Sequence, residues 1–359
     1  MAKATVARCE AQHLPQVFEL YQRTFGGNGR RNFERRYRWS RLENLAPADT
    51  FEWVLLAEDG RVVGCLAALP VPYAVGGQRL WAHTTADFMV DPAYSFHGLS
   101  LMRECFKRCP RQVSLDDVAA TKAVLGYFKA RAVLTLARHA KPLDGRVLQG
   151  RPGWVGKVPP VLLAPAGPAL RALDRVRRPG GLEAAVPVPF DGRFDAFAAA
   201  GAARGGASVY RDQAYYRWRY GPGSPQAGAQ ALALLDGSGA PRAYAVVATG
   251  TGDVPQGHLL ELVSDGPLAK EGWLALLVAA VGALRTQGAS AAYAHLSEAS
   301  PPELLAAMGA LGFTARAYRT TLFTRPSPAD DPALGALLHD ATRWDFQYGD
   351  AEVTHSVVV

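Results

Sequence analysis

The chain has 359 residues, of which 49% are hydrophobic and 20% charged, and its formal net charge is +7. This composition indicates a folded protein, its length predicts two domains, and no apolar run reaches the roughly 18 residues that a transmembrane helix requires. The short basic clusters Arg30-Arg31 and Arg35-Arg36 lack the interleaved aromatic residues of a nucleic-acid groove. We therefore expect no nucleic-acid partner.

Targeting and metal signals are missing from the sequence. The first residues contain no apolar signal-peptide core, which predicts a cytoplasmic protein. The four cysteines form no C-x-x-C pair. We expect reduced thiols and no metal site.

The first 145 residues predict a mixed α/β unit. Two helical segments, 13–24 and 31–43, precede a pair of strands joined by an Asp-Gly turn within 55–69. A strand then leads, through a turn that contains proline, into alternating helices and strands at 86–90, 98–109, 112–116 and 119–131. This order favours helices packed on a sheet.

The second half of the chain repeats this order. Tyr37-Arg38-Trp39 recurs as Tyr216-Arg217-Trp218, 179 residues later. The Asp-Gly hairpin recurs within 232–247, and the strand at 86–90 recurs at 259–263, an offset of 173 residues. Several matches in one order and at nearly one spacing indicate an internal duplication.

These patterns predict the fold class and its domains. We expect a mixed α/β (α+β) protein with two similar domains at 1–145 and 189–359, each a mostly antiparallel mixed sheet flanked by helices. Between them lies a Pro- and Gly-rich connector, 146–188, with one short helix at 168–178.

The turn after the strand at 86–90 carries a family resemblance. Val90, Pro92, Gly98 and Ser100 fall on the pattern V-x-P-x-x-R/Q-x-x-G-x-G/A, which is the acyl-CoA motif of the GNAT acyltransferase superfamily. The chain resembles a tandem-GNAT protein over nearly its full length. Ser95 departs from the motif at the Arg/Gln position, and Phe96 and His97 replace small and basic residues.

The resemblance implies a site for an acyl thioester. Backbone N–H groups at the start of a helix bind anions, so this segment would hold the pyrophosphate of acetyl-CoA or a longer acyl-CoA. Because of the departures at Ser95 and Phe96, an acyl-carrier protein is an alternative donor. The residues implied in donor binding, with a backbone group of Met89 at the thioester, are Met89, Val90, Ser95, Phe96, His97, Gly98, Leu99 and Ser100.

Three residues are candidates for proton transfer. Tyr127 resembles the tyrosine of the family pattern Y-x-x-x-G-F, which implies a general acid for the leaving thiolate, although Arg131 and Ala132 replace Gly and Phe. Strand alternation places His83 and Asp87 on one face, together with Met89. Either His83 or Asp87 is a candidate general base.

The second copy departs further from the motif. It lacks R/Q-x-x-G-x-G/A, places the acidic Asp265 where phosphates would lie, and has Met308 at the tyrosine position. We expect this half to be structural or to bind the acceptor.

The resulting hypothesis is an N-acyltransferase. It would move an acyl group from an acyl thioester to an amine of a sugar, a peptide or a natural product. The alternative is a tandem-GNAT protein whose thioester sites have both decayed, leaving a binding or scaffold protein.

Overall fold

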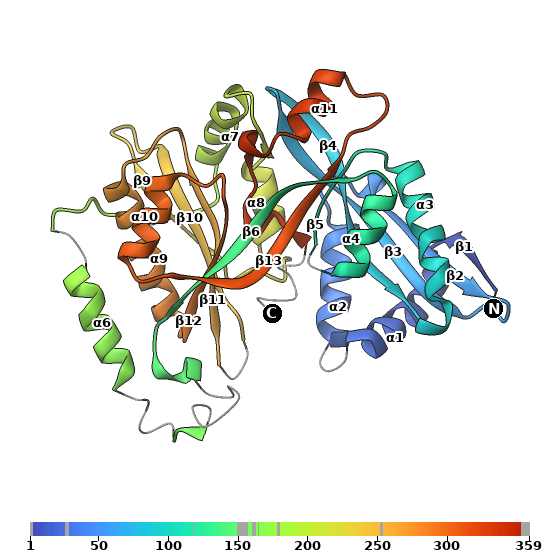
Figure 1. Ribbon diagram of the computed structural model, residues 1–359, viewed down its shortest axis with the longest axis horizontal. Coiled ribbons are helices and arrows are strands. Elements are labelled where there is room, and N and C mark those ends of the chain that lie inside the picture. The colour runs from blue at the N-terminus through green and yellow to red at the C-terminus, as the bar shows by residue number, and fades with distance from the viewer. Residues whose placement is uncertain are drawn as a thin grey trace.

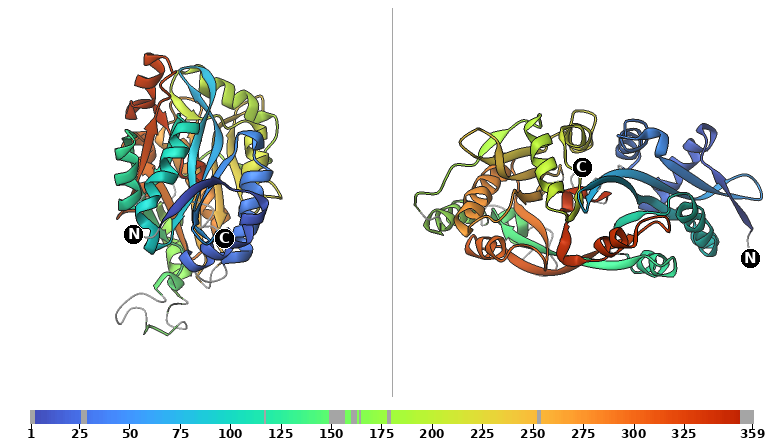
Figure 2. Two further views of the ribbon diagram at one scale, coloured as in Figure 1. Left: turned by 90° about the vertical axis from the view of Figure 1, so that its right-hand side faces the viewer. Right: turned by 90° about the horizontal axis from the view of Figure 1, so that it is seen from above.

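The computed structural model describes residues 3–25, 29–116, 118–148, 157–159, 163, 165–177, 180–251 and 254–352, with the side chains of 29–32 and 120 excepted. Within these ranges the strands join in one 14-stranded mixed sheet that runs through both halves of the chain (Figure 1). Helices cover both faces of the sheet, as the two further views in Figure 2 show. The predicted mixed α/β fold class is confirmed. None of the helices in these ranges is both long and apolar enough to cross a membrane.

The first half is a layered unit with helices on both faces of its sheet. Leu101, Met102 and Leu125 pack on one face, and Val17 and Leu20 pack on the other. The elements are β1 (Ala4–Arg8), α1 (Leu14–Phe25), α2 (Gly29–Tyr37), β2 (Phe51–Ala57), β3 (Val62–Val75), β4 (Gln78–Val90), α3 (Gly98–Arg108), β5 (Gln112–Asp116), α4 (Ala119–Tyr127) and β6 (Arg131–Pro142).

The second half has the same layers. Trp273 and Met308, from its two last long helices, pack on one face of the sheet, and Phe194 and Tyr216 pack on the other. The elements are α6 (Ala166–Arg177), β7 (Val186–Val188), α7 (Arg193–Ala203), β8 (Ala207–Val209), α8 (Gln213–Tyr220), β9 (Gln230–Leu235), β10 (Pro241–Thr249), β11 (Gln256–Ser264), α9 (Lys270–Thr286), β12 (Ala291–Ser297), α10 (Pro302–Ala310), β13 (Thr314–Arg325), α11 (Pro332–Leu338) and β14 (Trp344–Asp345).

The strand order of the two halves agrees with the predicted duplication. The sheet contains the order β1-β2-β3-β4-β5 in the first half and β7-β9-β10-β11-β12 in the second. In both copies the fourth strand is antiparallel to the third and parallel to the fifth. The strand pairings align Gly64 with Ala243 and Val90 with Ser264, so the offset at this strand is 174 residues rather than 173.

The last strand of each half crosses to the other half. β6 pairs with β12 over residues 136–142, while β13 lies between β5 and β6. In Figure 1 these two long, paired strands run through the centre of the molecule from one half to the other. The limits expected at 145 and 189 therefore separate segments of sequence, whereas the sheet is shared between them.

The repeated tryptophans contact each other where the halves meet. Trp39 and Trp218 stack with ring centroids 4.7 Å apart. The indole of Trp39 donates to the carbonyl of Trp218 at 2.6 Å, and the indole of Trp218 donates to the carbonyl of Trp39 at 3.3 Å. The repeat found in the sequence is thus a pair of equivalent residues at a pseudo-twofold contact.

Candidate acyl-transfer site

The segment with the motif lies beside a fork between two parallel strands. β4 and β5 pair at a single position, His83 with Gln112. One step further, the Thr85 N–H group donates to the Ser114 hydroxyl at 3.2 Å. Beyond this point, the described residues of the two strands do not pair. The region between the two strand ends is called the gap below.

A β-bulge in β4 changes which side chains share a face. The pairing with β3 shifts between Cys65 and Ala67, and Asp87 has a positive φ of 51°. Before the bulge, His83 lies 5.9 Å from the Phe51 ring, on the face that α3 covers. After it, Met89 packs with residues of α1 on the opposite face. The prediction that His83, Asp87 and Met89 share a face is wrong, because the bulge adds a residue and reverses the alternation.

The bulge also decides which backbone groups face the gap. The Asp91 N–H group donates to the Val63 carbonyl of β3 at 2.7 Å. Because N–H groups alternate along an antiparallel strand, Met89 directs its N–H group toward β3 as well. By the same alternation, Phe88 and Val90 direct theirs away from β3. Because the backbone of Met89 pairs with Cys65 of β3, the prediction that places a backbone group of Met89 at the thioester is not supported.

The segment after β4 is helical, not an open turn. A 3-10 helix, η4 (Pro92–His97), runs directly into α3, and the Asp91 carboxylate accepts a hydrogen bond from the Ala93 N–H group at 3.0 Å. The Gly98 N–H group donates to the Ser95 carbonyl, so in this conformation it is not open to an anion. Phe96 is 74% exposed.

Gly98 has a packing role in addition to the one that its motif implies. A Cβ atom at this position would lie 3.2 Å from Cζ of Phe88 and 3.5 Å from Cγ2 of Val90. Glycine at this position thus lets the start of α3 approach the side chains of Phe88 and Val90 in β4.

Asp87 belongs to a buried charge cluster. Its Oδ2 atom accepts a hydrogen bond from Arg41 at 2.6 Å, and its Oδ1 atom accepts one from Arg36. Arg41 also lies 3.6 Å from Glu52, and Arg36 lies 3.5 Å from Glu352. The side chain of Asp87 is 3% exposed. With both oxygens held by guanidinium groups, Asp87 is a structural anion here, and the prediction of a base open to substrate is not supported.

His83 lies at the closed end of the gap. Its Nε2 atom is 3.1 Å from the Asp49 carbonyl, so Nε2 carries the proton and Nδ1 has the free lone pair. Burial lowers the pKa of His83, and this carbonyl opposes that effect. A neutral imidazole is the form that accepts a proton, so the prediction of a general base stays open for this residue.

The end of α4 shows that Tyr127 is not at the tyrosine position of the family pattern. Lys129 has a φ of 65°, and the Ala130 N–H group donates to the Leu125 carbonyl at 3.0 Å. In the second copy Gly312 has a φ of 82° and the Phe313 N–H group donates to the Met308 carbonyl at 3.0 Å. Lys129 is thus the counterpart of Gly312, and Leu125, which is fully buried, is the counterpart of Met308.

Tyr127 therefore lies two residues beyond the position that the pattern predicts. It is 66% exposed, and its ring packs edge-on against Phe128 with centroids 5.1 Å apart. Among the contacts of the described residues, none joins Tyr127 to His83 or Asp87.

The second half contains a matching fork between β11 and β12, with its own buried acid. Glu261 is the counterpart of Asp87 and accepts hydrogen bonds from the hydroxyls of Tyr216 at 2.6 Å and Tyr220 at 2.7 Å. Burial raises the pKa of Glu261 to about 7, with Asp350 as a second cause. Sequence comparison of the copies missed this residue, because the offset of 173 pairs Asp87 with Leu260.

The chain itself fills this second fork. The side chain of Gln347 accepts a hydrogen bond from the Leu262 N–H group at 3.0 Å, and Leu262 is the counterpart of Phe88. The Tyr348 ring stacks on His295 of β12 with centroids 3.6 Å apart. Asp350 then pairs with Arg211 at 2.6 Å. Residues 347–350 thus occupy the place that a ligand would need to thread between the strands.

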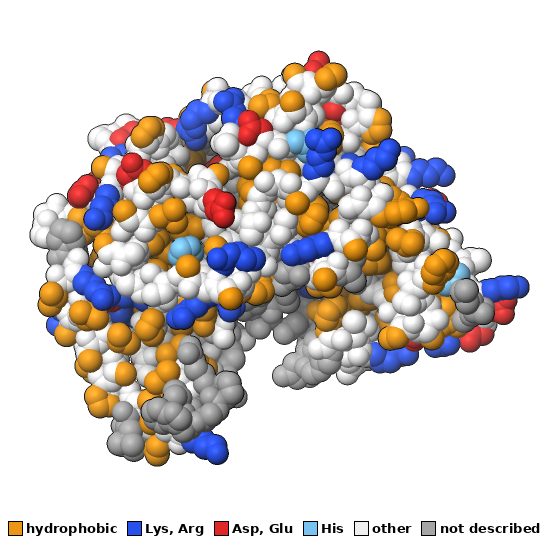
Figure 3. All heavy atoms as spheres, in the orientation of Figure 1, with side chains coloured by type: hydrophobic (Ala, Val, Ile, Leu, Met, Phe, Trp, Pro, Cys, Tyr) orange, Lys and Arg blue, Asp and Glu red, His pale blue; other side chains and the backbone are white. Residues whose placement is uncertain are grey.

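Basic side chains do not gather at one place on the visible surface. In Figure 3, Lys and Arg are spread over both halves of the face shown. The described residues also contain no group of three or more His, Cys, Asp or Glu side chains that could hold a metal ion.

Comparison with known proteins identifies the first half. Residues 5–118 match the family model described as an acetyltransferase (GNAT) domain. No curated protein sequence matches the chain.

Several solved structures resemble the whole chain at low sequence identity. Saccharomyces cerevisiae N-myristoyltransferase, with bound myristoyl-CoA and inhibitors, has a TM-score of 0.60 and 13% identity over 96% of this chain and 85% of that chain. A probable N-acyltransferase of unknown function from Enterococcus faecalis has a TM-score of 0.58 and 10% identity, covering 90% and 72%. A GCN5-related N-acetyltransferase from Anabaena variabilis has a TM-score of 0.55 and 14% identity, covering 90% and 72%.

At these identities the likeness concerns the fold, which is shared over nearly the full chain. Together with the match of residues 5–118, it shows that this chain carries a GNAT acetyltransferase domain in its first half and has the overall fold of the GNAT N-acyltransferases.

Proposed function

We propose that this protein transfers an acyl group from an acyl thioester, such as an acyl-CoA, to an amine. The observation that carries the proposal is the fork between β4 and β5, which pair at His83 and, within the described residues, no longer pair toward the ends of the two strands. The start of α3 lies against Phe88 and Val90. The fold of the GNAT N-acyltransferases, and the myristoyl-CoA bound by the yeast protein of that fold, support an acyl-CoA donor.

The chemistry follows from these positions. The thioester carbonyl would lie in the gap and accept a hydrogen bond from Phe88 or Val90, which stabilises the oxyanion formed when the amine attacks. The carbon–sulfur bond then breaks and the thiolate leaves. Neutral His83, directly or through water, would take the proton that the amine loses.

The donor phosphates would lie at the segment between Ser95 and Ser100. For the Gly98 N–H group to contribute, it must leave the Ser95 carbonyl, so donor binding would open the last turn of η4. This rearrangement is local because Ser95 and Phe96 are exposed.

The second half would serve as a structural half, without a thioester. Its fork is filled by residues 347–350. The second half lacks the acyl-CoA sequence motif, and the filled fork agrees with that loss.

The alternative of a binding or scaffold protein has one observation in its favour. The Asp91 carboxylate and the Ser95 carbonyl already occupy backbone donors of the segment that would hold the phosphates.

Donor binding separates the two functions. We would titrate the full chain with acetyl-CoA, octanoyl-CoA and palmitoyl-CoA by calorimetry and compare two variants of the exposed Ser95. Ser95→Asp should weaken binding by about tenfold, because it adds a negative charge near the phosphates, and Ser95→Asn should bind like the wild type. No binding of any of the three thioesters would reject the enzyme with a CoA donor. Equal binding by both variants would place the phosphates elsewhere.

Activity is the second measurement. Release of free CoA in the presence of a panel of primary amines, followed with a thiol reagent, should depend on both donor and amine. Donor binding without any CoA release over the panel would favour the scaffold alternative.

A further inference from the structure

Helix α6 is held against the protein through its one acidic residue. Asp174 accepts hydrogen bonds from Lys141 of β6 at 2.7 Å and from Arg285 of α9 at 2.6 Å. Gly167, two turns earlier on the same face of the helix, is buried. Figure 1 shows α6 at the outer edge of the molecule. These contacts fix which face of α6 points toward the protein.

The opposite face of α6 is apolar and exposed. Its residues follow the i, i+3, i+4, i+7 spacing of a single helix face, and they are Ala169, Ala172, Leu173 and Val176. Val176 is 84% exposed, more than any other large hydrophobic residue in the described ranges. Hydrophobic side chains are visible at this edge of the molecule in Figure 3. A surface helix normally turns such a stripe toward the core, so the reversed orientation of α6 leaves this face open to a partner.

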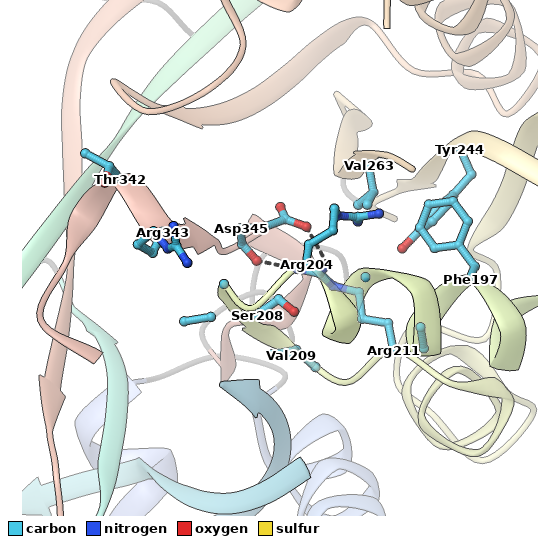
Figure 4. A pocket seen from close by; sticks show the side chains of 14 residues that line it. Phe197, Arg204, Ser208, Val209, Arg211, Tyr244, Val263, Thr342, Arg343 and Asp345 are labelled. Carbon is cyan, nitrogen blue, oxygen red and sulfur yellow. Dashed lines mark hydrogen bonds and ion pairs between the residues drawn. The ribbon is translucent and has the colours of Figure 1, made fainter. Parts of the chain in front are cut away.

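Arginines border the apolar face. α6 contains three arginines and one aspartate, and two of the arginines, Arg171 and Arg175, are exposed one turn apart. Both oxygens of Asp174 are bonded to cations outside the helix, and within the described part of the chain no ion pair joins Arg171 or Arg175 to a carboxylate. By contrast, Arg211 pairs with Asp345 at 3.0 Å in the depression that Figure 4 shows. The positive charge beside the apolar face of α6 is therefore available to an anionic partner.

The combination of charge and apolar surface selects the kind of partner. A nucleic acid would pair with the arginines but leave the apolar stripe in contact with water. An anionic phospholipid bilayer matches both features, because apolar side chains enter the boundary between headgroups and acyl chains while arginines stay at the level of the phosphates. A helix of 12 residues lies in the plane of such a surface and does not span it.

We propose that α6 docks this protein onto a membrane surface that contains anionic phospholipids. Leu173 and Val176 enter the headgroup region, and Arg171 and Arg175 pair with lipid phosphates. The contact is peripheral and reversible, because two large apolar side chains bind a bilayer far less tightly than a spanning helix does. This docking surface does not depend on acyl transfer in the first half.

The test is cosedimentation of the full chain with phosphatidylcholine vesicles prepared with and without phosphatidylserine. The wild type should bind the vesicles with phosphatidylserine at least about tenfold more tightly, because the arginines contribute on an anionic surface. Val176→Asp should weaken that binding at least about tenfold, since it places a carboxylate where an apolar side chain enters the bilayer. Val118→Asp, at a residue of the first half that is 55% exposed, adds the same charge and should bind like the wild type.

The arginines are tested by a second pair of variants. Arg171→Gln combined with Arg175→Gln should reduce the preference for phosphatidylserine to less than about threefold. Arg316→Gln, at an exposed position on β13, should keep the preference. Because the altered side chains are exposed, every variant should melt like the wild type, and thermal denaturation checks that it is folded.

Three results would overturn the proposal. They are no binding to either vesicle by the wild type, unchanged binding by Val176→Asp, and a wild-type dimer in sedimentation velocity that Val176→Asp dissociates without any vesicle binding. The last result would assign the apolar face to a second copy of the chain. Donor binding by the Ser95 variants is measured separately, so failure here leaves the acyl-transfer proposal intact, and the reverse also holds.

Discussion

Asp87 lies at the centre of a buried cluster that joins three distant parts of the chain. Arg36 and Arg41 come from the helical region after α1, Asp87 from the bulge in β4, and Glu352 from the last described residues. Burial raises the pKa of Glu352, and Arg36 opposes that effect. The residue type alone therefore does not make a carboxylate a general base, because its ion-pair and hydrogen-bond partners determine whether its oxygens are free to accept a proton.

Replacement of Asp87 should destabilise the protein. Asp87→Asn removes the charge that faces two buried guanidinium groups, and breaking a buried ion pair typically costs about 3–5 kcal/mol. Urea denaturation followed by tryptophan fluorescence measures this loss. Glu58→Gln, at an exposed side chain, is the control and should not change the unfolding midpoint measurably. A stable Asp87→Asn protein without activity would instead mark Asp87 as a catalytic residue.

Replacement of Tyr127 should have little effect on turnover. A general acid contributes about 10²–10⁴-fold, whereas we expect Tyr127→Phe to change turnover by less than about threefold, since this ring is largely exposed. Steady-state rates of CoA release at saturating donor provide the measurement. A loss of a hundredfold or more, with donor affinity unchanged, would restore Tyr127 as the acid.

At the scale of elements, equivalent helices of the two copies end in the same backbone conformation, a left-handed residue after the last turn, although the residue types differ. The turn after α4 places Lys129 in the left-handed region, where its counterpart after α10 is Gly312. Strand β4 and strand β11 likewise both contain a bulge before the fork. The geometry of the element ends thus agrees between the copies where the residues do not.

Glycine at position 129 should stabilise the first half. A side chain in the left-handed region costs on the order of 1 kcal/mol, so Lys129→Gly should raise the free energy of unfolding by about that amount. The reciprocal variant Gly312→Ala should lower it, and its Cβ atom would also run into the end of the Arg177 side chain. Both changes are measured by urea denaturation. A decrease in stability for Lys129→Gly would contradict this account of the helix end.

At the scale of the whole molecule, the two halves share one sheet and one central contact. β6 of the first half pairs with β12 of the second, and β13 of the second half pairs with β5 of the first. Trp39 stacks on Trp218 where the halves meet. Close to this shared region lie two buried histidines, His258 and His295, which stand on the neighbouring strands β11 and β12. The pKa of His258 is lowered to about 4, mainly by burial and also by Arg138. That of His295 is lowered to about 3, by burial and by His258 and Arg138.

The stability of the protein should fall as the pH is lowered from about 6.5 to about 4. In this window both histidines are protonated in the unfolded chain and neutral in the native state. The unfolded state therefore binds more protons, so acid favours unfolding. Glu261 acts in the opposite direction, because its raised pKa makes the native state hold a proton between about pH 4.5 and 7. The raised pKa of Glu352 acts in the same direction as that of Glu261. Burial also lowers the pKa values of His83, His139 and His339, so the histidines together outweigh the two glutamates.

Urea denaturation at several pH values measures this slope. His258→Asn should make the loss of stability on acidification shallower, and Glu261→Gln should make it steeper because it removes the opposing group. A stability that stays constant or rises between pH 6.5 and 4.5 would contradict the assignment.

The order of elements and the duplication could be predicted from the chain, because hydrophobic periodicity and turn residues are local properties. The expected helix at 168–178 corresponds to α6, and the repeated Tyr-Arg-Trp segment corresponds to a real structural equivalence. The segment proposed to bind the donor was chosen by its glycine and proline spacing, and its role stays a prediction. These features require only residues that are near each other along the chain.

The parts of the site that depend on distant partners could not be predicted in this way. Alternation along β4 is broken because the pairing with β3 accommodates an extra residue at Asp87. The tyrosine position was misaligned because Lys129 adopts a backbone conformation that glycine usually provides.

The sequence by itself determined the order of elements in two similar halves and the resemblance of one segment in the first half to an acyl-CoA motif, because both depend on the spacing of residues that are near each other along the chain. Only the tertiary structure decided that β6 and β13 cross between the halves, that Asp87 is neutralised by two arginines, and that residues 347–350 fill the second fork. The physical reason is that ladder register, ion pairing and packing are set by groups that the fold brings together from far along the chain.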